Sequence, residues 1–312
     1  MAADQVVGLG GRHILLTGAT GMVGAPLARV LARDNIVYGG ARFSNGAAHG
    51  ALAEAGVTPV RVDLGAADFA EVPADVDVVL NFAVARSNDW SADFATNVDG
   101  VALLMEHCVT RCDRLEAFLH CSTAGVYQSQ GQVLLTESAP LGDSHRAAGF
   151  ETYSLSKIAV EPLVRHTAAR LGLPTVIARL SVPYGDTFGW PCFQLLMIER
   201  GIPLNVHPDA PSRYSPLHLD DIAASLPVLL GAASVPATVV NWGGDETVAL
   251  EEWCGYLGEL VGAEPVFTVD PNAIPPLPLD LSRLHALGFH STVDWRDGMR
   301  RLVAASRGAT AQ

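Results

Sequence analysis

The stretch His13-Ile14-Leu15-Leu16-Thr17-Gly18-Ala19-Thr20-Gly21-Met22-Val23-Gly24 joins an apolar run directly to a glycine-rich turn. Residues 13–16 have the composition of a buried strand, and a helical pattern begins within the turn. Glycines three apart let a backbone turn approach a pyrophosphate, and the following helix offers free N–H groups and a positive dipole end. A tight structural turn could use the same glycines. The segments that surround the turn are needed to distinguish a dinucleotide-binding turn from a structural one.

Strand-like and helix-like segments alternate after this turn. The predicted strands are residues 13–16, 36–41, 58–62, 76–80, 117–121 and 175–178. The predicted helices are residues 22–33, 92–112 and 153–171, where apolar residues recur at three- and four-residue spacing. This alternation predicts an α/β fold with a doubly wound parallel Rossmann sheet covered by helices on both faces. In that setting the glycine turn favours dinucleotide binding.

The sequence pattern changes beyond Tyr184: prolines become frequent, and apolar residues seldom recur at helical or strand spacing. We therefore expect a dinucleotide-binding domain over residues 1–181 and a smaller C-terminal substrate lobe over residues 182–216 and 243–312. Residues 217–242, with a helix signal at 220–230 and a strand signal at 238–241, are predicted to return to the sheet. Residues 271–278 read as a proline-rich loop.

The composition limits the partners. The chain has 312 residues, 49% of them hydrophobic and 17% charged, which is typical of a folded globular protein. Its formal net charge of −13 disfavours nucleic acid and anionic membrane surfaces as partners. We see no signal peptide and no membrane span, and expect a cytoplasmic protein that acts on a small molecule.

Five scattered cysteines do not suit a disulfide framework, because their number is odd. Cys108 and Cys112 follow His107 on a predicted helix, so a metal site can be imagined there. No second cluster completes four ligands. We expect packed thiols and no metal site.

The end of the second predicted strand bears on the choice of dinucleotide. An acidic residue there accepts hydrogen bonds from the adenosine ribose, whereas an arginine pairs with a 2′-phosphate. The segment Val37-Tyr38-Gly39-Gly40-Ala41-Arg42 holds no acid and one arginine. The sequence therefore favours NADP over NAD, unless Arg42 is only a solvated surface residue.

Tyr153 and Lys157 are four residues apart, so on a helix their side chains share one face. An ammonium near a phenol should lower its pKa from about 10 towards the working range of a general acid–base. Lys157 is the single lysine among 20 basic residues. Keeping lysine at one position indicates a need for a compact point charge that arginine cannot replace.

Two more polar residues are candidates, one at the predicted carboxyl edge of the sheet and one on a predicted helix. Thr123 follows the strand that ends at Cys121 and can donate a hydrogen bond to a substrate oxygen, although it could also cap a turn. Asn97 lies on the same helical face as the apolar residues Val101 and Leu104. A buried asparagine needs partners, so it either ties a neighbouring backbone or supports a proton relay.

With the glycine turn, Thr123, Tyr153 and Lys157 in this order, the chain resembles the extended short-chain dehydrogenase/reductase family, the branch of sugar-nucleotide epimerases and dehydratases. The resemblance runs nearly end to end. Its further landmarks are Asp63-Leu64, Asn81-Phe82-Ala83, Ala178-Arg179…Tyr184-Gly185, Ser215-Pro216-Leu217-His218-Leu219-Asp220-Asp221 and Asn241-Trp242-Gly243-Gly244.

The resemblance implies the roles of these residues. Tyr153 would be the acid–base, Lys157 would hold the nicotinamide ribose and tune the tyrosine, and Thr123 would bind the reacting oxygen. The implied cofactor contacts are Gly18, Thr20, Gly21, Met22, Val23, Gly24, Arg42, Asp63, Leu64, Phe82, Ala83, Val84, Asn97, Cys121, Tyr153, Lys157 and Pro183. The implied substrate contacts are Thr123, Val182, Tyr184, Trp190 and Arg213. A homodimer would pair through the helices that carry Asn97 and Tyr153.

Three departures limit the resemblance. Dehydratases of this family place an Asp-Glu pair directly after the catalytic threonine, where this chain has Ala124 and Gly125, so simple dehydration is not expected. Nucleotide-sugar members carry an asparagine at the position of Val182, which weakens the case for such a substrate, while Arg213 could still hold a diphosphate. Pro162 lies inside the Tyr153 helix, where it should cost about 3 kcal/mol unless a kink absorbs it.

The sequence thus predicts an NAD(P)-dependent oxidoreductase or epimerase that acts on a secondary alcohol or ketone of a sugar-like or polyketide-like molecule. It leaves open whether the reaction is a reduction or an epimerisation. A pocket lined by Val182, Tyr184, Phe188, Trp190 and Phe193 would favour a partly apolar substrate. The alternative is a non-enzymatic sensor or scaffold of the same fold, which would need the glycine turn but not the three catalytic side chains.

Overall fold

The computed structural model describes residues 9–44, 46–142, 147 and 151–310. The chain forms two compact units. The first comprises Met1–Thr123, Gly149–Arg179 and Ala223–Val240, and the second comprises Ala124–Ala148, Leu180–Ile222 and Asn241–Gln312. Because the chain leaves each unit and later returns to it, neither unit is one continuous segment.

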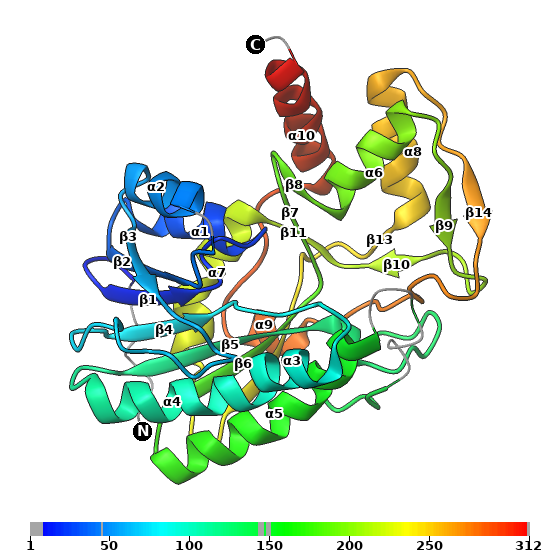
Figure 1. Ribbon diagram of the computed structural model, residues 1–312. Helices are drawn as coiled ribbons and strands as arrows, with labels where there is room; N and C mark the ends of the chain where they lie inside the picture. The colour runs from blue at the N-terminus through cyan, green and yellow to red at the C-terminus, as the bar shows by residue number, and fades with distance from the viewer. Residues whose placement is uncertain (1–8, 45, 143–146, 148–150, 311–312) are drawn as a thin grey trace. The chain divides into compact units, whose positions relative to one another are not determined.

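A seven-stranded sheet with the order β12-β6-β5-β4-β1-β2-β3 forms the centre of the first unit (Figure 1). Its strands are β1 (His13–Thr17), β2 (Ile36–Ala41), β3 (Thr58–Arg61), β4 (Val78–Asn81), β5 (Ala117–Thr123), β6 (Thr175–Leu180) and β12 (Thr238–Trp242). The pairs β1·β2, β1·β4, β2·β3 and β4·β5 are parallel. Every residue of β4 and β6 is buried, as strands covered on both faces require. The predicted fold class is confirmed.

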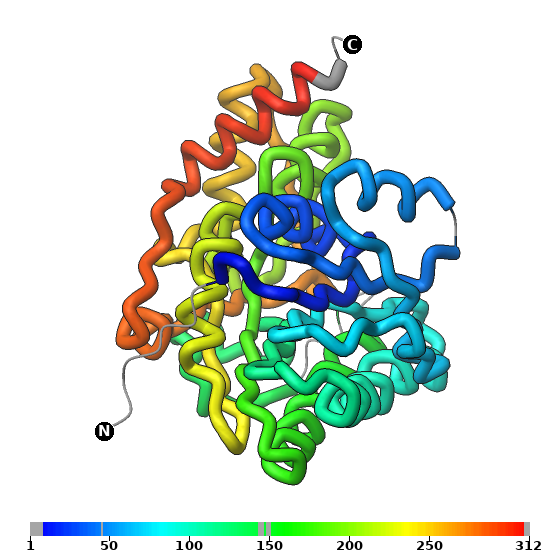
Figure 2. The backbone as a smooth tube through the Cα atoms, turned by 90° about the vertical axis from the view of Figure 1, so that its left-hand side faces the viewer, coloured from blue at the N-terminus to red at the C-terminus, as the bar shows by residue number. Residues whose placement is uncertain are grey.

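Helices cover both faces of this sheet. Leu15 and Leu16 are neighbours on β1 and therefore point to opposite faces. Leu15 packs in the core below α4 (Gly100–Arg111) and α5 (Glu151–Leu171), which lie side by side on one face (Figures 1 and 2). Leu16 faces the start of α1 (Gly24–Leu31) on the other face, where a Cβ on Gly24 would be 3.3 Å from its Cδ2.

The strand order reverses between β1 and β4. From β1 the chain moves outward to β2 and β3, whereas β4, β5 and β6 follow on the other side. Thr17 and Asn81, the last residues of β1 and β4, are direct neighbours in register. Ligands of open α/β sheets bind in the crevice at the carboxyl ends of the strands where this reversal occurs.

The second unit consists of small sheets and helices. Its sheets have the orders β11-β7-β8, β10-β13 and β14-β9. The strands are β7 (Val182–Gly185), β8 (Phe188–Gly189), β9 (Leu204–Val206), β10 (Arg213–Tyr214), β11 (Pro216–His218), β13 (Val248–Ala249) and β14 (Phe267–Val269). The helices are α6 (Trp190–Glu199), α8 (Leu250–Val261), α9 (Ser282–Ala286) and α10 (Trp295–Thr310), and α7 (Leu219–Gly231) contributes to both units.

The predicted single helix over residues 92–112 is wrong in detail. The segment consists of α3 (Trp90–Phe94), a π-helical turn (Ala95–Asp99) and α4. Directly after the π-helical turn the chain packs closely on the Leu64 backbone, since a Cβ on Gly100 would lie 2.3 Å from the Leu64 carbonyl oxygen. π-Helical turns of this kind frequently mark functional sites.

Two other helices depart from expectation. Helix α2 (Gly46–Glu54) was not predicted, because Leu52 is its only buried residue and it carries no apolar stripe. Helix α5 continues through Pro162, whose side chain is exposed. Among the described residues, no helix has the length and hydropathy needed to cross a membrane.

Candidate active site

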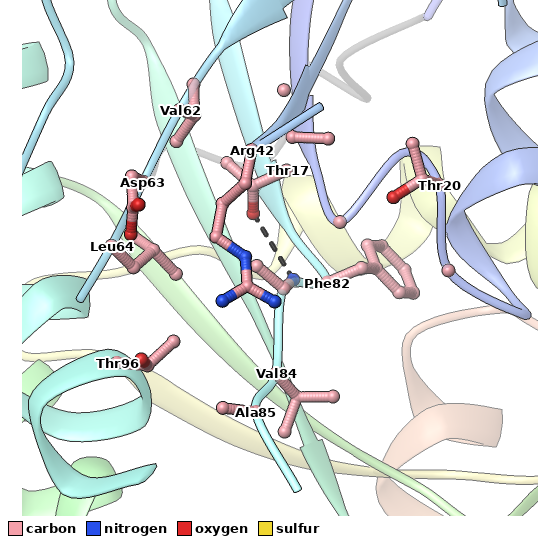
Figure 3. Close-up of a pocket in the computed structure, with 15 residues that line it drawn as sticks. Thr17, Thr20, Arg42, Val62, Asp63, Leu64, Phe82, Val84, Ala85 and Thr96 are labelled. Atoms are coloured by element: carbon pink, nitrogen blue, oxygen red, sulfur yellow. Dashed lines mark hydrogen bonds between the residues drawn. The ribbon is translucent and has the colours of Figure 1, made fainter. Parts of the chain in front are cut away.

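A pocket lies in the first unit at the carboxyl ends of β1 to β4 (Figure 3). Many residues implied by the sequence as cofactor contacts line it, namely Gly18, Thr20, Gly21, Arg42, Asp63, Leu64, Phe82, Ala83 and Val84. The sequence did not single out six further lining residues, Thr17, Gly40, Ala41, Val62, Ala85 and Thr96. Thr17, Gly40 and Ala41 belong to the quoted glycine turn and second strand, whereas Val62, Ala85 and Thr96 are identified only by the packing of the chain around the pocket.

Two glycines of the turn, Gly18 and Gly24, have no room for a side chain. Gly18 adopts a φ of +73°, and a Cβ there would lie 2.7 Å from the Ala83 nitrogen. A Cβ on Gly24 would lie 2.2 Å from the Gly18 carbonyl oxygen. The α1 N-terminus that follows has no side-chain cap and no acidic residue in its first turn. Its free N–H groups and dipole suit a pyrophosphate, so these residues fit a dinucleotide.

Arg42 extends its guanidinium across this pocket towards the Phe82–Val84 segment (Figure 3). Asp63, after the adjacent strand β3, supplies a carboxylate to the same pocket, and its Oδ1 accepts a hydrogen bond from the Ala66 nitrogen at 3.2 Å. The pocket therefore offers both a cation for a phosphate and an acceptor for a hydroxyl or amine.

A buried chain of hydrogen bonds supports the pocket floor. Thr17 Oγ1 donates to Asn81 Oδ1 at 2.6 Å and accepts from the Ala83 nitrogen at 3.3 Å. Asn81 Nδ2 lies 3.0 Å from His120 Nδ1. Burial, and then the charge of Lys157, hold the pKa of His120 well below its usual range, so its imidazole is neutral at pH 7.

Thr123, Tyr153 and Lys157 come together next to the end of β5. The Thr123 and Tyr153 side chains share a hydrogen bond, although these residues come from β5 and α5. Lys157 is buried one turn after Tyr153, and its Nζ donates to the Cys121 carbonyl oxygen at 2.8 Å. The three side chains predicted to perform the chemistry thus share one site.

The predicted lowering of the Tyr153 pKa is wrong. Burial raises the pKa of this phenol, while the hydrogen bond with Thr123 and the charge of Arg86 oppose the rise. The pKa of Lys157 is lowered by burial, against the opposing influence of Cys121 and Glu161. Desolvation dominates both groups because each ionises inside the protein rather than at its surface.

Arg86 is a functional candidate that sequence reasoning missed. Its guanidinium carbon lies 5.2 Å from the centroid of the Tyr153 ring. The loop that carries it is tied down by the buried Asp93 carboxylate, which accepts from the Ser87 hydroxyl at 2.6 Å and from Thr152 Oγ1 at 2.6 Å. An arginine just past the end of β4 was the available signal, because that edge of the sheet carries the site.

Asn97 ties backbone and helix together. Its Oδ1 accepts from the Ala85 nitrogen at 2.7 Å, and its Nδ2 donates to the Ala85 carbonyl at 2.9 Å and to Ser156 Oγ at 3.0 Å. Ala85 lines the pocket and Ser156 precedes Lys157. Of the two roles considered for a buried asparagine, the contacts match the tying of a neighbouring backbone.

A buried ion pair joins α5 to β6, and its α5 member, Glu161, follows Lys157 by one helical turn. Arg179 Nη2 is 2.6 Å from Glu161 Oε2, and the Ser122 hydroxyl donates to Glu161 Oε1 at 2.6 Å. Glu161 and Arg179 are 3% and 4% exposed, so their charges depend on each other. Since Ser122 precedes Thr123, this pair fixes α5 against the end of β5.

The residues implied as substrate contacts beyond residue 180 belong to the second unit. Tyr184 is buried, and its ring packs edge-on against His218 at 5.1 Å. Trp190 packs edge-on against Tyr214 at 5.6 Å. Val182 is buried and Pro183 and Phe188 are half-buried, whereas Phe193 and Arg213 are exposed. Nothing in these contacts tests the predicted substrate role, which stays a prediction.

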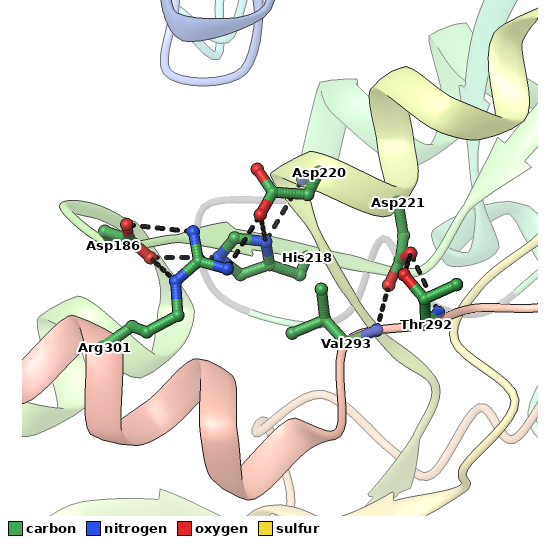
Figure 4. A network of polar contacts seen from close by, with 7 residues as sticks. All are labelled: Asp186, His218, Asp220, Asp221, Thr292, Val293 and Arg301. Atoms are coloured by element: carbon green, nitrogen blue, oxygen red, sulfur yellow. Dashed lines mark hydrogen bonds and ion pairs between the residues drawn. The ribbon is translucent and has the colours of Figure 1, made fainter.

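The Ser215–Asp221 landmark has a structural function in the second unit (Figure 4). Arg301 of α10 pairs with Asp186 at 3.0 Å and with Asp220 at 2.7 Å. Asp221 accepts from the Thr292 nitrogen at 2.9 Å and the Val293 nitrogen at 3.0 Å. These carboxylates fasten α10 and the segment before it to the start of α7.

The cysteines predicted to be packed thiols are free. Cys108 and Cys112 are buried, and Cys112 Sγ donates to the Pro73 carbonyl oxygen at 3.4 Å. His107 packs its ring 5.4 Å from Phe69. In the described part of the chain these three residues do not form a group of converging metal ligands.

A glycine turn at the switch point of a doubly wound sheet, with Thr123, Tyr153 and Lys157 in the same unit, is the set of features that characterises the extended short-chain dehydrogenase/reductase class. Residues 14–197 match the model of the NAD dependent epimerase/dehydratase family. The chain belongs to this family, which confirms the resemblance drawn from its motifs.

The curated relatives are enzymes of sugar-nucleotide chemistry. A trifunctional UDP-glucose 4,6-dehydratase, UDP-4-keto-6-deoxy-D-glucose 3,5-epimerase and UDP-4-keto-L-rhamnose-reductase of Arabidopsis thaliana is 26% identical over 94% of this chain. The chain spans 47% of that relative's length. A dTDP-glucose 4,6-dehydratase of Haemophilus influenzae is 27% identical over 93% of this chain and 96% of its own length.

Solved structures share the fold. The UDP-glucuronic acid 4-epimerase of Bacillus cereus, in complex with UDP-glucuronic acid and NAD, matches with a TM-score of 0.79 at 21% identity, covering 95% of this chain and 99% of its own. The dTDP-glucose 4,6-dehydratase of Bacillus anthracis, in complex with NAD, matches with a TM-score of 0.80 at 19% identity, covering 96% of this chain and 98% of its own.

Proposed function

We propose that this enzyme moves hydride between a nicotinamide dinucleotide and a secondary alcohol or ketone of a sugar nucleotide, in an epimerisation or a net reduction. The observation that carries the proposal is the Thr123–Tyr153 hydrogen bond beside buried Lys157. A sensor of the same fold would not need these three groups together. The curated relatives, which act on UDP- and dTDP-sugars, support the choice of substrate class.

The side chains divide the chemistry between them. The bound dinucleotide supplies or accepts the hydride. Tyr153 Oη takes the proton of the substrate hydroxyl during oxidation and returns it during reduction. Thr123 holds the reacting oxygen beside that phenol. Lys157 is the buried side chain that would hold the nicotinamide ribose, and Arg86 opposes the rise in the Tyr153 pKa caused by burial.

We do not expect this enzyme to eliminate water from its substrate. A dehydration needs an acid and a base beside the sugar in addition to the tyrosine, and the two positions after Thr123 are Ala124 and Gly125. Neither carries an ionisable group. We therefore expect hydride transfer without loss of water, even though dehydratases are among the relatives.

The test is turnover on a panel of UDP- and dTDP-sugars with NAD or NADP added, and on their keto derivatives with NADH or NADPH added, followed by chromatography of the sugar nucleotides. We expect an epimer or a keto or reduced product from at least one of them, and none from Tyr153→Phe. Mass spectrometry of nucleotide released on denaturation separates the two reactions, because retained cofactor supports epimerisation and free exchange supports net reduction. If the unmodified chain bound no dinucleotide, the proposal would fail.

Within this function we propose a preference for NADP. The Arg42 guanidinium in the pocket and the lack of an acid on the β2 end support it, although both structures compared above hold NAD. Calorimetry with NADPH and NADH should show tighter NADPH binding, and Arg42→Ala should remove most of the difference. Equal affinities in the unmodified chain would overturn this preference and leave the proposed reaction standing.

We also propose a partly apolar substrate site that includes Val182, Trp190 and Arg213, and a cytoplasmic location. Finally, we propose a homodimer that pairs through α4, α5 and the Asn97 turn. Exposed Leu103 and Val109 on α4 support such pairing, being 42% and 37% exposed. Sedimentation should give twice the chain mass, and Leu103→Glu should reduce it. A ligand-bound structure with the substrate away from Val182 and Trp190 would remove those residues from the site.

A further inference from the structure

The second unit carries a group of three converging side chains that the proposed reaction does not use. Asp245 lies in the loop after β12, His285 in α9 and His290 after it. One donor atom from each, a carboxylate oxygen and two imidazole nitrogens, all lie within 4.8 Å of one another. In the part of the chain described by the structure, no other group of His, Cys, Asp and Glu side chains converges in this way.

The distances within this Asp-His-His cluster suit a small cation. His285 Nε2 is 3.2 Å from Asp245 Oδ1, and His290 Nδ1 is 2.7 Å from Asp245 Oδ2. Ligands about 2.0–2.1 Å from a tetrahedral Zn²⁺ are about 3.3 Å apart. The first pair is already at that separation. The second pair uses the other oxygen of the same carboxylate and would need to open by about 0.6 Å, which the exposed His290 side chain can accommodate.

The polypeptide holds the three ligands in place. The two imidazole rings are stacked with centroids 4.3 Å apart, so both present their edges to the same carboxylate. Buried Leu284 and Phe289 anchor the chain beside each histidine, and Gly288, with a φ of +95°, turns the chain between them. The cluster is therefore organised by residues that are not themselves ligands.

Support for the carboxylate comes from Ser291. Its backbone nitrogen donates to Asp245 Oδ1 at 3.1 Å, and its hydroxyl accepts from the Asp245 nitrogen at 2.9 Å. Hydrogen bonds of this kind orient ligands in metal sites, where their removal weakens metal binding 10- to 100-fold, to order of magnitude. They restrict the carboxylate to the side where the imidazoles lie.

We propose that Asp245, His285 and His290 bind one divalent transition-metal ion, with Zn²⁺ the best match. Imidazole nitrogens favour Zn²⁺ and its neighbours over Mg²⁺ or Ca²⁺, which prefer oxygen ligands. The His290 and His285 side chains are 61% and 35% exposed, so solvent can deliver the ion and complete its coordination with water. The ion would clamp the β12–β13 loop to the segment after α9.

The test is calorimetric titration of the full chain, free of any polyhistidine tag, with ZnCl₂ and with MgCl₂. We expect one equivalent of Zn²⁺ to bind, a higher thermal unfolding midpoint with Zn²⁺, and neither effect with Mg²⁺. His290→Ala should weaken Zn²⁺ binding at least 10-fold, to order of magnitude. His166→Ala, which removes an exposed histidine of α5, is the matched control and should bind normally.

A second variant distinguishes the loss of a metal ligand from misfolding of the chain. Asp245→Asn keeps the size of the side chain, so its circular dichroism should match the parent while its Zn²⁺ affinity falls. Co²⁺ substitution should give the visible absorption of a tetrahedral site in the parent and not in His290→Ala. The proposal is overturned if the parent shows no saturable Zn²⁺ binding, or if the two ligand variants bind Zn²⁺ as tightly as the His166→Ala control.

Discussion

The nucleotide pocket and the catalytic helix belong to the same unit but are built differently. The glycine turn at the pocket depends on backbone, because Gly18 and Gly24 leave no space for a Cβ and α1 presents an uncapped N-terminus. The catalytic region is formed by side chains, and Lys157 and Glu161 on α5 are buried. The glycine turn depends on the absence of side-chain atoms at two positions, whereas the catalytic helix depends on buried charged side chains that need partners.

The largest effect should come from the catalytic lysine. Lys157→Arg keeps the charge, but a planar guanidinium cannot take the place of the ammonium that donates to the Cys121 carbonyl. We expect turnover to fall about 10²–10⁴-fold, as for loss of a placed acid–base. Steady-state kinetics measures this, and Tyr153→Phe should lose turnover while keeping dinucleotide affinity. Near-normal turnover of Lys157→Arg would contradict the role assigned to a point charge.

The buried ion pair should matter mainly for stability. Glu161→Gln leaves the Arg179 guanidinium buried without its counter-charge, which should cost about 3–5 kcal/mol of unfolding free energy. Urea titration followed by circular dichroism measures the loss. Combining Glu161→Gln with Arg179→Met removes both charges and should recover much of it. An additive, larger loss in the double variant would show that the pair does not act as one unit.

The pocket should respond to a single methyl group. Gly18→Ala places a Cβ 2.7 Å from the Ala83 nitrogen at a φ of +73°. The turn must shift, and we expect dinucleotide affinity to fall at least 10-fold, which corresponds to about 1.4 kcal/mol. Gly56→Ala is a matched control, because Gly56 has a φ of +76° with nothing within 4 Å of the added Cβ. It should lose similar backbone energy and bind the cofactor normally.

The smallest effect should be a shift of the pH profile. Arg86 lowers the pKa of Tyr153, so its removal raises that pKa and reduces the phenolate present at a given pH. For alcohol oxidation, which needs the phenolate, Arg86→Ala should move the rising limb of activity to higher pH by up to about one unit. Arg86→Lys keeps a cation over the ring and should shift it less. A profile that moved to lower pH would reverse the assignment.

Most elements that position the site could be predicted because their signals are local. The strand that leads into the glycine turn is a short apolar run, and the α5 pair of Tyr153 and Lys157 follows helical spacing. Helix α2 was not predicted because it has one buried residue and therefore no apolar stripe. The π-helical turn was not predicted because an extra residue in a helical turn leaves no local sequence pattern. Arg86 escaped because its importance depends on a ring 67 positions away in the chain.

The sequence by itself determined the fold class, the glycine turn and the identity of Thr123, Tyr153 and Lys157, because periodicity and motif spacing are properties of neighbouring residues. Tertiary structure decided their environment. Burial raised the pKa of Tyr153 against the expectation from its helical neighbour, and packing joined Glu161 to Arg179 and Asp245 to two histidines. Desolvation and long-range contact depend on which distant segments meet, and that is settled only when the chain folds.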